Sequence, residues 1–263
     1  MQNIKRALAQ LIRTFGIEVS SDDRGLKLYW GLFTQGSGVN FEGGLGDFRP
    51  VIQKMRANGG LKDAVRIRQL IDDGEITVKI KITDHRYTHE NTMDVEIDGP
   101  HSIDDAETLE VIERFRGALE ELKCKASCEA HSLIHDYVLL SVSEDEVMRT
   151  YTTARFMVDL IRAADTDCEA LDWNLEGLED DEIVDCLRSS LDSSKYVACN
   201  FKVVISERED ADSDDWEEVY TEFIGGGLYE HSDVKGELRD LARNAIYELR
   251  KERNNQCQLK EAA

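Results

Sequence analysis

Residues 75–83 read Glu-Ile-Thr-Val-Lys-Ile-Lys-Ile-Thr, and this stretch sets the fold class of the chain. Apolar side chains alternate with polar ones from Ile76 to Ile82, which is typical of a β-strand with one buried face and one solvated face. Residues 87–97 follow and supply an antiparallel partner. Helical patterns flank this pair, so we predict an α+β fold of antiparallel sheets with packed helices, arranged in two domains.

The remaining elements follow from the spacing of apolar residues and from turn residues. Gly225-Gly226-Gly227 is expected to break the chain after the last strand. The long helix after Pro100 should bury a stripe on one face, formed by Ile112, Phe115, Leu119, Leu122, Ala126 and Leu133. We expect helices at residues 2–15, 61–71, 144–164, 180–191 and 233–253, a helix capped by Asp47 that runs through about Ala57, and a long helix capped by Ser102 and Asp104. Strands are expected at 26–33, 39–42, 196–206 and 216–224, and the strand at 196–206 should place Val197, Cys199, Phe201 and Val203 on one face.

Negative charge is confined to the second part of this chain of 263 residues and net charge −22. Residues 1–100 carry 14 basic and 14 acidic side chains, whereas residues 101–263 carry 18 and 40. Gly99-Pro100 separates the two parts. We therefore predict a charge-balanced α+β domain at 1–100 and a strongly acidic α+β domain at 101–263.

The composition limits the class of partner and the compartment. A pI near 4.6 disfavours direct binding to nucleic acid or to an anionic membrane, because phosphate groups would repel the protein. The N-terminus lacks the pattern of a signal peptide, and the chain lacks an apolar run of membrane-spanning length. The six cysteines are then most simply reduced thiols. These features predict a cytoplasmic protein, and nothing in the sequence calls for a cofactor.

Two short blocks carry a family resemblance. Residues 29–43 read Tyr-Trp-Gly-Leu-Phe-Thr-Gln-Gly-Ser-Gly-Val-Asn-Phe-Glu-Gly, and residues 86–93 read Arg-Tyr-Thr-His-Glu-Asn-Thr-Met. The region 28–97 resembles phage and prophage proteins of unknown function that share an S-Q-G-D-G-x-x-F-x-G-like motif. Ser37 and Arg86 replace that group's Asp and first His. The resemblance implies a mobile-element origin and no particular mechanism.

Few residues in the chain suggest catalysis or metal binding. Cys124, Cys128, His131 and His135 fall on one helical face, and zinc accepts such ligands. They span too much of a straight helix to surround one ion, so we expect a helix packed on both faces, with cysteines as small core residues and no metal. A small metal- or nucleotide-dependent enzyme remains an alternative, and its residues would be Gln35, His89, Glu90, His131 and His135.

The acid run is the main functional feature of the sequence. Residues 165–222 hold 20 acidic side chains against four basic ones. Such an array can imitate the charge density of duplex DNA, and interspersed tryptophans would act as apolar anchors. We therefore predict a phage-type, anti-defence, DNA-mimic-like inhibitor that is not an enzyme. Its partner would be a basic host protein or nucleoprotein complex of the restriction, CRISPR, nuclease or recombination type.

An acidic scaffold or assembly protein is a further alternative, and a homo-oligomer is left open. Loop 210–216 resembles a calcium loop but lacks its glycine and final glutamate, so we read it as an exposed acidic turn between two strands. The predicted partner-binding residues are Gln35, Asp172, Trp173, Glu179, Asp180, Asp181, Glu182, Asp185, Asp210, Asp212, Asp214, Asp215, Trp216, Glu217 and Glu218.

Overall fold

The computed structural model describes residues 2–29, 38–57, 60–83, 92–99, 105–165, 169–210 and 214–261. Helices and two antiparallel sheets make up these segments, so the α+β prediction is confirmed. The chain forms two compact units. The N-terminal unit comprises Gln2–Val138 and Gly177–Ser189, and the C-terminal unit comprises Leu139–Glu176 and Ser190–Ala263. This division does not follow the charge boundary at Gly99-Pro100, because part of the acidic sequence belongs to the N-terminal unit.

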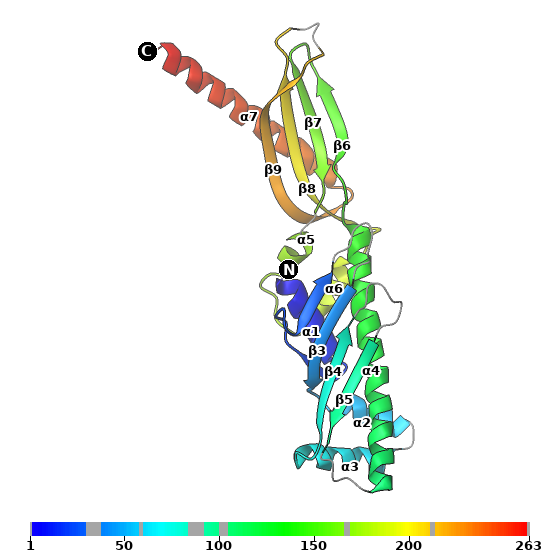
Figure 1. Cartoon of the computed structure of the whole chain (residues 1–263). Coiled ribbons are helices and arrows are strands. Elements are labelled where there is room, and N and C mark those ends of the chain that lie inside the picture. The colour runs from blue at the N-terminus through cyan, green and yellow to red at the C-terminus, as the bar shows by residue number, and fades with distance from the viewer. Residues whose placement is uncertain are drawn as a thin grey trace. The chain divides into compact units, whose positions relative to one another are not determined.

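The N-terminal unit is built on an antiparallel sheet. Its strands run in the order β1-β3-β4-β5, and β2 also pairs with β3. The predicted pairing of the alternating strand with the segment after it is confirmed, with Ile80 opposite Val95. The strands are β1 (Ile17–Val19), β2 (Leu26–Tyr29), β3 (Gly38–Leu45), β4 (Thr77–Thr83) and β5 (Thr92–Asp98) (Figure 1).

Helices supply the rest of the core of this unit. The stripe predicted for the long helix is buried, with Phe115 fully inaccessible. That helix is capped by Asp105, whose carboxylate accepts hydrogen bonds from the backbone N–H groups of Glu107 and Thr108 at 3.3 Å. The caps expected at Ser102 and Asp104 lie outside the described residues. The helices are α1 (Gln2–Arg13), α2 (Arg49–Ala57), α3 (Leu61–Asp72), α4 (Ala106–Leu140) and α6 (Ile183–Ser190).

The C-terminal unit is a second antiparallel sheet with helices. Its strands follow one another in the order β6-β7-β8-β9, and α7 lies against one face of the sheet (Figure 1). The elements are β6 (Glu146–Thr152), β7 (Phe156–Ala163), α5 (Glu169–Asn174), β8 (Tyr196–Glu207), β9 (Glu217–Glu230) and α7 (Val234–Glu261).

The prediction of a helix at residues 144–164 is wrong, because this segment is the β6–β7 hairpin. Its turn is closed by Thr153, whose N–H donates to the carbonyl of Phe156 at 2.8 Å and whose hydroxyl accepts from the N–H of Phe156 at 2.9 Å. The segment is rich in β-branched and aromatic residues, which favour a pleated surface. β8 then pairs along the whole of β7, and this pairing decides the local structure.

The prediction that Gly225-Gly226-Gly227 breaks the chain is also wrong, since β9 continues through all three glycines. At Gly226, α5 and the adjacent strand β8 come close to the backbone of β9. A Cβ atom there would be 3.1 Å from the backbone N of Ala170 in α5 and 3.2 Å from Oδ1 of Asn200. The glycine therefore allows α5 to pack on the strand.

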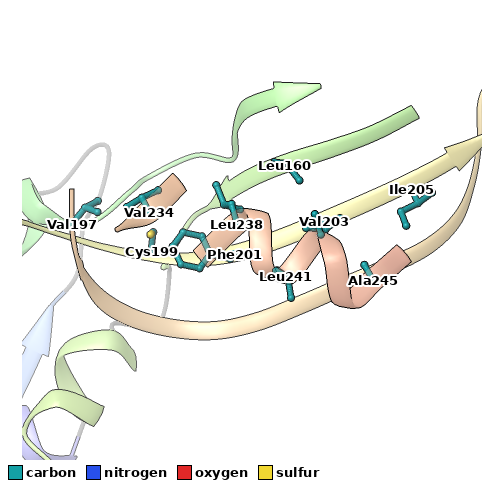
Figure 2. Close-up of a cluster of buried hydrophobic side chains, with 11 residues drawn as sticks. Leu160, Val197, Cys199, Phe201, Val203, Ile205, Val234, Leu238, Leu241 and Ala245 are labelled. Atoms are coloured by element: carbon teal, nitrogen blue, oxygen red, sulfur yellow. The ribbon is translucent and has the colours of Figure 1, made fainter. Parts of the chain in front are cut away.

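The core of the C-terminal unit lies between β8 and α7 (Figure 2). Every second residue of β8 faces the helix, as the alternation predicted. Among them is Cys199, whose burial raises the pKa of its thiol to about 12, so this cysteine is an inert core residue. The facing side chains are Val197, Cys199, Phe201, Val203 and Ile205 from β8, and Val234, Leu238, Leu241 and Ala245 from α7.

Replacing Gly226 with alanine should destabilise the protein by about 1–3 kcal/mol, because the new methyl group overpacks the contact with α5. Urea unfolding measures this change. Gly225→Ala is the matched control, since the described residues place no atom within 4 Å of a Cβ at that position. Equal stability of the two variants would contradict the packing described for α5.

Candidate functional site: the acidic end of the β8–β9 hairpin

The predicted contact residues lie in three places. Asp172 and Trp173 are on α5, and residues 210 and 214–218 lie where β8 ends and β9 begins; both places belong to the C-terminal unit. Residues 179–185 belong to the N-terminal unit, where they lead into α6. Gln35 and Asp212 lie outside the described residues.

Within the C-terminal unit the two places do not form one surface. α5 contacts β9 at Gly226, whereas Glu217 begins that strand. Nine residues of extended strand separate these positions, or about 30 Å. Trp173 is 61% exposed on α5, but it is remote from the acids at the other end of the sheet.

In the N-terminal unit, Asp180 has a structural partner. Nε of Arg6 donates to its Oδ1 at 2.7 Å, and the side-chain amide of Gln10 donates to its Oδ2. Nη2 of Arg6 also donates to the carbonyl of Leu178 at 2.5 Å. These contacts fasten the segment before α6 to α1. The neighbouring Glu179, Asp181 and Glu182 are exposed, and Asp185 lies 3.7 Å from Arg188.

The remaining acids gather where β8 ends and β9 begins. We call this set the acidic hairpin end: Glu209, Asp210, Asp214, Asp215, Glu217 and Glu218, all of which are exposed. The prediction of an exposed acidic connection between two strands is therefore confirmed for its described residues. Trp216 lies among these acids and is half-buried.

Arg208 orders the acidic hairpin end. Its Nε donates to the carbonyl of Ala154, in the turn between β6 and β7, at 2.8 Å. Its guanidinium carbon lies 4.6 Å from the ring centre of Trp216, within the range of a cation–π interaction. One arginine thus joins the two hairpin turns at this end of the sheet and fixes the tryptophan.

Glu207, the last residue of β8, is held from two sides. Arg253 of α7 donates to it from Nη2 at 2.5 Å, and Arg155 donates from Nη2 at 2.8 Å. The hydrogen bond from Arg253, and to a smaller extent the charges of both arginines, lower the pKa of Glu207. Arg253 also lies over the ring of Phe156, at 5.1 Å. The base of the acidic hairpin end is therefore rigid.

Sequence reasoning missed these four supporting residues, Arg155, Glu207, Arg208 and Arg253. They come from the turn before β7, the end of β8 and the C-terminal part of α7, which are distant in sequence, so no local spacing marks them. The sequence offered one weak signal, which is that arginines are rare in residues 165–222. This rarity does not show which residues an arginine such as Arg208 contacts.

The residues of the enzyme alternative are not assembled into a site in the described part of the chain. His89 and Glu90 lie outside it. Cys124 and Cys128 are exposed, so the expectation that they serve as small core residues is wrong; α4 leaves this face open. Across the described segments, no three His, Cys, Asp or Glu side chains converge as a metal site would require.

A polar pocket of about 510 Å³ lies at the other end of the C-terminal sheet, lined in part by Arg162, Tyr196 and His231. Arg162 is paired with Glu146. Nε2 of His231 lies 3.1 Å from the carbonyl of Ser193. The side chains of Arg162 and His231 therefore have structural partners at this pocket.

No protein-family model matches the chain, and neither a curated protein nor a solved structure is detectably similar to it. Among the described helices, none combines the length and the apolar character needed to cross a bilayer.

Replacing Glu207 with glutamine should lower the free energy of unfolding by about 1–2 kcal/mol at pH 7, because both arginines lose a charged acceptor. The pKa of Glu207 in the folded protein lies below 4.5, its ordinary value. The carboxylate therefore stabilises the fold above that ordinary value, and this contribution is lost as pH falls through the lowered pKa.

Urea unfolding of both proteins between pH 7 and pH 3 measures this effect, and the difference should shrink as the pH falls. Glu209→Gln is the control, since Glu209 is an exposed neighbour and should cost little at any pH. A difference between wild type and Glu207→Gln that does not change with pH would contradict the assignment of Arg253 and Arg155 as partners.

Proposed function

We propose that this protein is a non-enzymatic inhibitor that acts in the bacterial cytoplasm by occupying a basic, nucleic-acid-binding surface of a host protein complex. The observation that carries the proposal is the acidic hairpin end, where six exposed carboxylates flank Trp216 in the sequence and Arg208 lies over its ring. A restriction enzyme, a CRISPR effector, a nuclease or a recombination complex presents a surface of the required charge.

Rigidity makes the acidic hairpin end a better ligand than a flexible acidic tail. Arg208 and the pair of arginines on Glu207 hold the hairpin before binding, so less conformational entropy is lost on association. These arginines contact Ala154, Trp216 and Glu207. The carboxylates of the acidic hairpin end are exposed to solvent, where a basic partner reaches them.

The charge of the whole protein would assist association. A net charge of −22 attracts a basic partner over several ångströms and raises the association rate at low salt. We expect the closely spaced acids to approach the linear charge density of a DNA duplex. Trp216 adds an aromatic group of the kind enriched at interface centres. The resemblance of residues 28–97 to phage proteins supports a target in host defence.

The intramolecular contacts of each predicted residue determine whether its charge can be reversed without perturbing the fold. Asp180 belongs to the predicted set, but its reversal would break the contacts with Arg6 and Gln10 and perturb the N-terminal unit. Glu209, Asp214 and Glu217 are exposed members of the acidic hairpin end and are better suited.

Reversing Glu209, Asp214 and Glu217 together to lysine should weaken capture of the partner by at least about tenfold, because favourable charge contacts become repulsive. Tagged protein is incubated with bacterial lysate at low salt, and bound proteins are identified by mass spectrometry. For the wild type we expect a nucleic-acid-binding protein that is released by added salt and by competing duplex DNA.

The matched control is the triple variant Asp73→Lys, Glu75→Lys and Asp98→Lys, which makes the same change in net charge at exposed positions of the N-terminal unit. This control should retain most of the capture. Equal loss in both variants would show that net charge alone is responsible. A folded test variant that captures and inhibits fully would refute the proposal, and a stable oligomer without a partner would favour a scaffold.

A further inference from the structure

Two thiols lie side by side on the exposed face of α4. Cys124 and Cys128 are four residues apart on this helix and are both exposed. Residues at this spacing are neighbours on a helix surface. Burial and, to a smaller extent, the neighbouring Cys124 raise the pKa of Cys128.

The geometry of a helix favours a bridging atom over a disulfide between these thiols. Cβ atoms four residues apart on a helix are about 5–6 Å from each other, whereas a disulfide needs about 3.8 Å. Oxidation would have to unwind a turn of α4. A metal ion bonded to two thiolates at about 2.3 Å each spans up to about 4.6 Å between the sulfur atoms, which suits the intact helix.

The number of ligands selects the kind of ion. Zinc in proteins takes four ligands, but in the described segments no third His, Cys, Asp or Glu side chain joins this pair. Soft thiolates bind Cu⁺ well, and two sulfur atoms suffice for this ion.

We propose that Cys124 and Cys128 form a two-coordinate site for a soft monovalent cation of the Cu⁺ type. Both thiols lose their protons to solvent as two S–Cu bonds form, so one ion replaces two protons and no electron is transferred. The cation removes the repulsion that two adjacent thiolates would otherwise feel. This site is separate from the acidic hairpin end and does not depend on the proposed function.

The test uses Cu⁺ itself, supplied anaerobically as the complex of a coloured chelator. The parent protein carries Cys168→Ser and Cys257→Ser, so that the remaining thiols are the four whose environment is described. We expect one Cu⁺ per chain to be withdrawn from the chelator. Cys124→Ser and Cys128→Ser should each weaken binding by at least about a hundredfold, because one of two ligands is lost.

Cys186→Ser is the matched control in the same unit and should bind as the parent does. In the unmodified chain, bound Cu⁺ should also protect Cys124 and Cys128 from alkylation, as read by peptide mass spectrometry. This second measurement needs no substitution. Binding that survives loss of Cys124 or Cys128, or alkylation that Cu⁺ does not slow, would overturn the site. Zn²⁺ binding of equal strength at the same residues would overturn the two-coordinate assignment.

Discussion

The hydrophobic contact between β8 and α7 is the interaction on which the C-terminal unit depends. Phe201, Val203 and Ile205 are almost wholly inaccessible against the helix, and each such side chain contributes about 1.5–3 kcal/mol on burial. β8 is the central partner of both β7 and β9. Its placement on α7 therefore fixes which face of the sheet is covered and which residues stand at the hairpin ends.

The same contact positions the charged residues at the candidate site. α7 packs along β8 far enough to bring Arg253 to Glu207 and Phe156, and the register of β7 with β8 brings Arg208 to the turn at Ala154. These arginines serve as structural contacts at the base of the hairpin. The exposed carboxylates beyond them create the local negative field that a basic partner would meet.

The described structure divides the acid-rich stretch between separate places. Asp180 fastens the segment before α6 to α1, and α5 lies about 30 Å along β9 from the hairpin end. A high density of acids in sequence is therefore not a single surface in space. The acids where β8 ends and β9 begins are concentrated, and the arginines on Glu207 and Trp216 support their base, so the proposed function rests on them.

The sequence by itself determined the elements whose periodicity is strong. The alternation in β4 and β8 and the apolar stripe of α4 are properties of single segments, and each was recognised because burial of one face needs a fixed spacing. Local spacing also placed the exposed acidic turn between two strands.

Only the tertiary structure decided the rest. Residues 144–164 form a hairpin because β8 pairs along β7, and β9 runs through three glycines because α5 packs against Gly226. The arginines that hold Glu207 and Trp216 come from elements far apart in the chain. Such contacts depend on which strands pair and where a helix lies, and no periodicity within one segment carries that information.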